Sequence, residues 1–372
     1  MAEAAPAPPQ ITGFGYVRPL GSGGFAHVYL YEQDMPRRVV AVKVLESGLH
    51  SSRDRSDFEA EADAMARLSS HPSIVSVWDA GVSSDGKAYI AMEYCPDSMR
   101  ERTRGRPAPL DTVLDAGVRL AGALETAHRA GVLHRDIKPS NVLIATTGRP
   151  ALSDFGISML SGRGASEDKA RAMSIPWAAP EVVSNASTGT VASEVWSLGA
   201  TLYTFAAGRS PFEHVDRAQN TQAKMISRIG QAKYSPVPGA QGYGPFDAVM
   251  ARAMSPRPEQ RFASMREFAE ALQQLQRQYG FDVTPLDLVE AGWVTPAAAS
   301  DALRTPAVSS VRPTSRAQQR AELRAAEMEA DRDGIVADRP SSPLKAGLIG
   351  AGIAVVVVGA AAIVSVMAGW IG

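Results

Sequence analysis

Eight consecutive residues, 134–141, carry the side chains in this chain that are best suited to chemistry, and their sequence is HRDIKPSN. Asp136 offers a carboxylate that can accept a proton from an incoming hydroxyl. Lys138 can neutralise a phosphate, and the amide oxygen of Asn141 suits a hard metal ion. After an apolar run, a second carboxylate, Asp154, stands on a tight turn with the sequence SDFG. The spacing predicts a site where a hydroxyl, a phosphate and a metal ion meet.

Two segments near the N-terminus could bind the rest of a phosphate-bearing ligand. Residues 20–29 read LGSGGFAHVY, and glycines at such a turn let backbone amides approach phosphate oxygens. Lys43 interrupts the apolar run 39–45, where a lysine is costly unless it meets an anion. Taken alone, the glycines are equally typical of a hairpin turn, and Lys43 of an edge-strand lysine that reaches water.

Taken together and in this order, the segments resemble the signature motifs of the eukaryotic-like (Hanks-type) protein Ser/Thr kinases of bacterial membranes. The resemblance runs from about residue 13 to about residue 279 and includes the APE sequence at 179–181. It implies an α+β class, bilobal protein-kinase fold, with a small antiparallel β N-lobe carrying one helix and a mostly helical C-lobe. It also implies ATP with Mg²⁺, or Mn²⁺ as an alternative, and protein substrates with Ser or Thr.

The resemblance assigns roles to individual residues. Asp136 orients a substrate Ser or Thr hydroxyl and accepts its proton, while Lys43 and Lys138 balance phosphate charge. Asn141 and Asp154 hold the metal ions. The catalytic set is therefore Asp136, Lys138, Lys43 and Asn141.

The nucleotide site follows from the same comparison. Lys43 needs a carboxylate partner on the following helix, where Glu59 and Glu61 are both candidates and the helical phase favours Glu61. Met92 is the expected gatekeeper, and backbone groups of Glu93 and Cys95 would bond adenine. The implied ATP-binding residues are Leu20, Gly21, Ser22, Gly23, Gly24, Val28, Ala41, Lys43, Glu61, Met92, Glu93, Cys95 and Leu143.

The sequence departs from the family where activity is usually regulated. Family activation loops commonly carry a phosphorylated threonine that binds the arginine before the catalytic aspartate, here Arg135. Residues 157–178 contain no Thr or Tyr. Three readings remain open: Glu167 or Asp168 pairs with Arg135, Ser166 is a phosphorylation site, or the segment is a plain acidic loop tip.

Other departures concern the parts that support the catalytic loop. Ser174 stands where the family has Thr, and its hydroxyl can still bridge Asp136 and Lys138. Glu194 replaces an aspartate that anchors the loop through backbone hydrogen bonds, and its longer side chain can still accept them. Further on, the resemblance pairs Arg261 with Glu181. Changes to Met173 and Trp177 alter the segment that docks the substrate peptide.

Composition sets broader limits. With 372 residues, a 45% hydrophobic share and a formal net charge of -1, the chain can build a core but lacks the basic balance of a nucleic-acid-binding protein. Its single cysteine, Cys95, excludes an intramolecular disulfide. The basic run 100–106 is read as a solvated loop or as a contact with anionic lipid.

The order of segments predicts four parts. Residues 1–10 form a disordered lead-in, 11–279 the kinase domain, 280–344 a flexible linker, and 345–371 a transmembrane helix. The last part carries no charge after its first residue and exceeds the roughly 20 apolar residues that a bilayer requires. Basic residues lie only on its N-terminal side, which predicts a single-pass protein of the cell membrane with a cytoplasmic kinase domain. Small residues near its start permit helix pairing and hence a homodimer.

Two functions of other kinds compete with an active protein kinase. One is a membrane-tethered pseudokinase scaffold that binds nucleotide or partners without catalysis. The other is a small-molecule kinase of the same fold, which the peptide-docking segment at 179–181 disfavours. Because every residue of the catalytic and metal-binding sets is present, the sequence favours the active enzyme.

Overall fold

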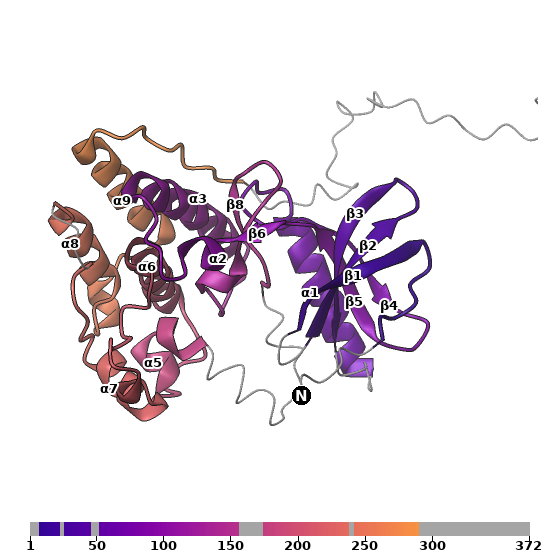
Figure 1. The fold of residues 1–372 in the computed structure, drawn as a ribbon, viewed down its shortest axis with the longest axis horizontal. Coiled ribbons are helices and arrows are strands. Elements are labelled where there is room, and N and C mark those ends of the chain that lie inside the picture. Colours follow the sequence, from indigo (N-terminus) through magenta and orange to yellow (C-terminus); the bar gives the residue numbers. More distant parts are fainter. Residues whose placement is uncertain (1–6, 23–25, 46–51, 156–173, 238–241, 290–372) are drawn as a thin grey trace, which may run out of the picture. The chain divides into compact units, whose positions relative to one another are not determined.

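The computed structural model describes residues 7–22, 26–45, 52–155, 174–237 and 242–289. The chain divides into two units, 1–294 and 295–372, and all described residues lie in the first. Within that unit, a β-rich N-terminal lobe precedes a helical C-terminal lobe (Figure 1). The predicted α+β, bilobal architecture is therefore confirmed for the first unit.

The N-terminal lobe is a five-stranded antiparallel sheet with the strand order β1-β2-β3-β5-β4. Side chains alternate between its faces, so Val40 and Val42 of β3 pack with Tyr31 on one face, while Ala41 and Lys43 belong to the other. The elements are β1 (Phe14–Ser22), β2 (Ala26–Gln33), β3 (Arg38–Leu45), α1 (Ser52–Leu68), β4 (Val77–Val82) and β5 (Ala88–Glu93). Alternation thus sends Lys43 toward the side of the sheet that shares a core with α1.

The predicted disordered lead-in differs from the structure in its second half. Residues 1–6 lie outside the described part, but the next residues pack against the sheet. The Tyr31 hydroxyl donates to the Pro9 carbonyl at 2.6 Å, and the Ser84 backbone N–H donates to the Gln10 carbonyl at 3.2 Å. These partners, Tyr31 in β2 and Ser84 in the turn after β4, are distant in sequence, so the local composition of the lead-in does not reveal them.

Three long helices form the centre of the C-terminal lobe: α3 (Leu110–Arg129), α6 (Val191–Ala207) and α9 (Met265–Tyr279). Thr190 and Ser193 close a capping box at the start of α6, and Gly208 ends that helix in the left-handed region with φ 71°. A small sheet in the order β6-β7-β8 combines one strand from before α3 with two strands from after it. The remaining elements are β6 (Asp97–Ser98), α2 (Met99–Thr103), β7 (Val142–Ile144), β8 (Pro150–Leu152), α5 (Pro180–Val183), α7 (Gln222–Gly230) and α8 (Gly244–Ala253).

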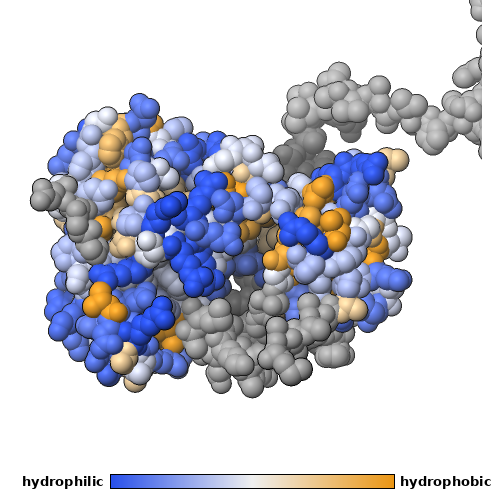
Figure 2. Space-filling model, in the orientation of Figure 1, coloured by the Kyte–Doolittle hydropathy of each residue, from blue (hydrophilic) through white to orange (hydrophobic). Residues whose placement is uncertain are grey.

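Burial of apolar side chains is the main source of stability for this unit. The larger core joins α1 to the buried faces of α3, α6 and α9 and includes the fully buried Trp196 and Phe205. The face drawn in Figure 2 is mostly hydrophilic, with hydrophobic residues in small groups. None of the helices in the described ranges is both long enough and apolar enough to cross a bilayer. The predicted transmembrane segment 345–371 lies outside those ranges.

The packed chain extends beyond the predicted end of the kinase domain. We predicted a flexible linker from residue 280, whereas the structure packs residues 281–289 along α3. Phe281 and Leu286 contact the larger core, and Thr284 is only 5% exposed. The rest of the predicted linker, from residue 290, lies outside the described part.

Candidate active site

The catalytic-loop segment follows α3 and is fixed by a buried histidine. The Asp136 N–H donates to His134 Nδ1 at 3.3 Å, so the other ring nitrogen, Nε2, carries the proton that reaches the Ser153 carbonyl at 2.9 Å. The ring of Phe155 lies against the same imidazole, with centroids 4.4 Å apart. His134 therefore ties the segment bearing Asp136 to the segment bearing Asp154.

The carboxylate of Asp136 is held through both of its oxygens. Oδ1 accepts the Ser174 hydroxyl at 2.7 Å, and Oδ2 lies 2.7 Å from Lys138 Nζ. Lys138 also donates to the Ser174 hydroxyl at 2.9 Å. The predicted bridge by Ser174 is therefore present, because a serine hydroxyl reaches both partners without the methyl group of threonine.

Asn141 is oriented by the same carboxylate. Its amide Nδ2 donates to the Asp136 carbonyl at 2.8 Å and to Oδ2 at 3.0 Å. The amide oxygen consequently points away from Asp136, where it accepts the Ser140 hydroxyl at 3.3 Å. The amide oxygen of Asn141 is thus presented on the side opposite the Asp136 carboxylate.

Asp154 forms an ion pair with Lys43, a contact across 111 residues of sequence, with Nζ and Oδ1 2.7 Å apart. Burial opposes ionisation of this carboxyl, but the charge of Lys43, its hydrogen bond to the carboxylate and the charge of Lys138 outweigh burial, and the pKa of Asp154 falls below its usual value. The predicted partner of Lys43, Glu61, lies on α1 as expected. Its side chain lies outside the described part of the structure, so that pairing stays a prediction.

The strand register brings the predicted nucleotide residues together. Val28 pairs with Gly21 on one side and with Lys43 on the other, and Ala41 pairs with Met92. Leu20, Val28, Leu143 and Cys95 are partly buried hydrophobic residues that pack on the larger core. The side chain of Ser22, together with Gly23 and Gly24, lies outside the described part. The Glu93 N–H already donates to the Ser76 carbonyl at 2.9 Å, which leaves an adenine contact at this residue to its carbonyl.

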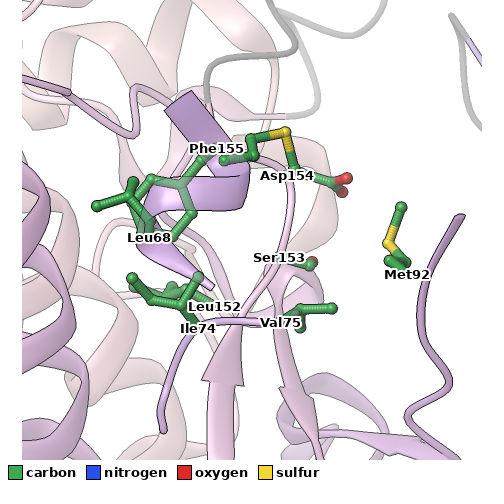
Figure 3. A pocket seen from close by; sticks show the side chains of 9 residues that line it. Leu68, Ile74, Val75, Met92, Leu152, Ser153, Asp154 and Phe155 are labelled. Atoms are coloured by element: carbon green, nitrogen blue, oxygen red, sulfur yellow. The ribbon is translucent and has the colours of Figure 1, made fainter. Parts of the chain in front are cut away.

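A small pocket lies between Met92, the end of α1 and the segment 152–155 (Figure 3). Its wall is apolar apart from Ser153 and Asp154, and Figure 3 shows the Asp154 carboxylate turned away from Phe155 and Leu68. The carboxylate is therefore directed away from the part of the wall that Leu68 and Phe155 form. The lining residues are Met65, Leu68, Ile74, Val75, Met92, Leu152, Ser153, Asp154 and Phe155.

Glu194 on α6 binds the backbone at the start of the catalytic loop. Its Oε1 accepts the Arg135 N–H at 2.6 Å, and its Oε2 lies 2.6 Å from Nε2 of His128, at the end of α3. Arg135 has a φ of 65°, a strained conformation for a non-glycine residue that this bond helps to hold. Glu194 thus accepts the backbone bond expected of the shorter aspartate. The sequence reasoning missed His128, whose only signal was a histidine at the polar end of an apolar helix.

One further predicted contact and one substituted residue can be followed in the structure. The Arg261 guanidinium binds Glu181 through two hydrogen bonds, at 2.7 and 2.9 Å, as expected. Trp177 donates its indole N–H to the Thr204 hydroxyl at 2.9 Å. The proposed regulatory residues Ser166, Glu167 and Asp168 and the substituted Met173 lie outside the described ranges, so their roles stay predictions.

This fold and this set of side chains define a protein kinase. Residues 14–277 match the family described as protein kinase domain. Serine/threonine-protein kinase PknK of Mycobacterium bovis is 40% identical over 287 residues, which cover 75% of this chain and 25% of that protein. PknF of Mycobacterium tuberculosis is 34% identical over 274 residues, which cover 70% of this chain and 56% of that protein. The chain thus spans a quarter to just over half of these relatives.

Solved structures agree with the sequence matches. The kinase domain of M. tuberculosis PknI is similar to this chain with a TM-score of 0.56 and 28% sequence identity, covering 73% of this chain and 97% of that one. The chain belongs to the protein kinase domain family, and its class is the bacterial Hanks-type serine/threonine-protein kinase.

Proposed function

We propose that this chain transfers the γ-phosphoryl group of ATP to the hydroxyl of a Ser or Thr in a protein substrate. One observation carries the proposal: the Asp136 carboxylate is held by Lys138, Ser174 and Asn141, and His134 links it to the loop of the Lys43–Asp154 pair. Such an arrangement favours catalysis by positioning and electrostatics, as in phosphoryl transfer.

In this mechanism Asp136 orients the substrate hydroxyl and accepts its proton as the oxygen attacks the γ-phosphorus. The bond from that phosphorus to the bridging oxygen breaks, and ADP leaves. Lys138, whose Nζ lies 2.7 Å from the Asp136 carboxylate, offsets negative charge on the transferred group. Ser174 prevents the carboxylate from rotating, because its hydroxyl occupies Oδ1 at 2.7 Å.

The residues present fit the metal ion that the family uses. The described part of the chain contains no cluster of three or more His, Cys, Asp or Glu residues that could form an all-protein metal site. Mg²⁺ commonly binds through one or two protein oxygens together with substrate phosphates. The ionised carboxylate of Asp154 and the amide oxygen of Asn141 are donors of that kind. When bound, the ion supplies positive charge that neutralises the phosphate oxygens.

The test is phosphate incorporation by the full-length chain with Mg-ATP, compared with the Asp136→Asn variant. Loss of a positioned base costs roughly 10²- to 10⁴-fold in rate. Asp63→Asn, an exposed site on α1, is the matched control and should leave the rate unchanged. If the wild-type chain binds ATP but neither it nor any control incorporates phosphate on Ser or Thr, the pseudokinase scaffold is the better description.

We further propose that residues 345–371 anchor the chain in the cell membrane with the kinase domain on the cytoplasmic side. The uncharged, apolar composition of this segment supports the anchor, and basic residues before it support the orientation. The full chain should sediment with membranes, and a chain ending at residue 344 should stay in the supernatant. An equal distribution of the two chains between the membrane fraction and the supernatant would contradict the anchor.

A further inference from the structure

The nine residues 281–289, which we call the strap, leave α9 and run back along α3. Gly280 allows the reversal because it adopts the left-handed conformation with φ 72°. Figure 1 shows this segment, in orange, passing beside α3 toward β8. The family match ends at residue 277, so the strap lies outside the part of the chain that the family describes.

The first anchor of the strap is a buried polar contact. The Thr284 N–H donates to Gln276 Oε1 at 3.0 Å, and the Gln276 amide donates to the Thr284 hydroxyl at 2.8 Å. That hydroxyl in turn donates to Asp115 of α3 at 2.8 Å. Gln276 is 1% exposed and Thr284 5%, so the polar groups of these two residues are removed from water and need each other as hydrogen-bond partners.

The second anchor is a position on α3 where only glycine fits. A Cβ built on Gly122 would lie 2.5 Å from the Asp287 carbonyl oxygen and 3.2 Å from Leu286 Cδ1. The three heavy atoms nearest that Cβ all belong to the strap. Glycine is a poor helix former, so its place in the middle of α3 is explained by the strap that lies against it.

The third anchor joins the strap to both lobes through one residue. The Asp287 carboxylate binds the Arg149 guanidinium of the β7–β8 turn at 2.6 Å. The Asp287 carbonyl lies 3.1 Å from His71 Nε2, in the segment after α1. Because His71 Nδ1 accepts the Ser73 N–H at 3.1 Å, Nε2 carries the proton and donates it to the strap.

From His71, hydrogen bonds lead directly to the metal-binding loop. The Leu152 N–H donates to the Ser73 carbonyl at 2.9 Å, and the Val75 N–H donates to the Leu152 carbonyl at 2.9 Å. Leu152 is two residues before Asp154, whose carboxylate binds Lys43. The strap is thus connected to the nucleotide site by a continuous chain of short contacts.

We propose that the strap positions Asp154: by holding the segment 71–75 against Leu152, it keeps the metal-binding carboxylate where Mg-ATP needs it. Asp287, Thr284 and Gly122 are positioning residues in this proposal, since none of them lies at the reacting atoms. The role given to the strap rests on the proposed kinase function, whereas the contacts of the strap do not. Coupling through such a network typically changes affinity by roughly 2- to 30-fold.

The experiment compares full-length wild-type, Gly122→Ala and Gly230→Ala chains. Gly230 is also helical, at the end of α7, and has no atom within 4 Å of a built Cβ, so it is the matched control. Gly122→Ala should raise the KM for Mg-ATP roughly 2- to 30-fold, because its Cβ must displace the strap backbone at Asp287. Hydrogen exchange of the Val75 and Leu152 amides should accelerate in this variant alone.

Asp287 gives a second, milder variant in case the alanine disturbs folding. Asp287→Ala should raise the same KM, and Asp287→Glu should restore part of it by re-forming the ion pair with Arg149. A purely structural strap would change the melting temperature but not the KM, and that result overturns the proposal.

Equilibrium binding separates this proposal from the proposed function. The Kd for a fluorescent ATP analogue with Mg²⁺ requires no turnover, so it can be measured even if the wild-type chain transfers no phosphate. A weaker Kd in Gly122→Ala supports the strap whatever the activity of the chain. An unchanged Kd and KM in both strap variants overturns it.

Discussion

Glu194 accepts the backbone N–H of Arg135 and meets His128 with its second oxygen, each at 2.6 Å. One carboxylate on α6 therefore fixes both the end of α3 and the start of the catalytic loop. Both side chains of the Glu194–His128 pair are less than 8% exposed, so water cannot replace a lost partner. The extra methylene group of Glu194, relative to aspartate, gives the side chain the length to reach both partners.

The first prediction shortens this side chain. Glu194→Asp should lose one of the two contacts and lower the free energy of unfolding by about 1–3 kcal/mol, because a buried partner is left unsatisfied. Glu194→Gln keeps the length and one acceptor oxygen for Arg135, so it should be the milder change. Chemical denaturation measures both. Equal stability of the wild-type and Glu194→Asp chains would show that the length of residue 194 is irrelevant.

The second prediction concerns the hydroxyl that bridges Asp136 and Lys138. Ser174→Ala removes one hydrogen bond to each charged group, and kcat should fall roughly 10- to 100-fold. Ser174→Thr keeps the hydroxyl and should stay near the wild-type rate. Steady-state kinetics on a Ser/Thr peptide provides the measurement, and a Ser174→Ala chain with full kcat would contradict the bridge.

The catalytic loops were predictable because their chemistry is local in sequence. Asp136, Lys138 and Asn141 fall within six residues, so their types and spacing already suggest a common site. The apolar residues of the helix Leu110–Arg129 repeat at the helical period, so this element is also visible in the local sequence. Local patterns of this kind predict structure well because tertiary contacts favour the same helix or loop as the local sequence does.

The contacts that escaped prediction are non-local. Lys43 meets Asp154 across 111 residues, and the strap residue Asp287 meets His71 across 216. No periodicity in either segment points to the other. Composition predicted a linker from residue 280, because Thr284 and Asp287 look like loop residues until their partners on α3 and the β7–β8 turn are known. Gly122, unusual in the middle of a helix, was the one local signal that something packs there.

The third prediction uses the charge of Asp154. Because its pKa is lower in the folded chain than the usual 3.8, the unfolded state binds more protons in this range, and stability rises with pH. The contribution is complete above about 3.8 and is lost as the pH falls through the folded pKa. The stability difference between wild type and Asp154→Asn should therefore be constant from pH 5 to 8 and change only under more acidic conditions. Denaturation at several pH values, with Asp63→Asn as the control, measures it.

The fourth prediction uses the neutral state of His71. Burial is the main reason that its pKa lies below the usual 6.5, so protonation favours the unfolded chain. Stability should be full above about pH 6.5 and decline as the pH falls toward the folded pKa. His71→Asn removes the titrating ring but keeps an acceptor for the Ser73 N–H. The loss of melting temperature between pH 7.5 and 5.5 should therefore be smaller in this variant, and an equal loss would exclude His71 as its source.

The fifth prediction concerns Cys95, the single thiol, beside the expected adenine site. Burial, assisted by the nearby charge of Glu93, raises the pKa of Cys95 to about 12. At pH 8 only about one thiol in ten thousand is then ionised, and the thiolate is the form that reacts. Native protein should resist alkylation by iodoacetamide for hours, whereas protein in denaturant should react fully within minutes. Mass spectrometry distinguishes the two states, and equal labelling would mean that the hinge thiol is exposed to solvent and that its burial does not control its reactivity.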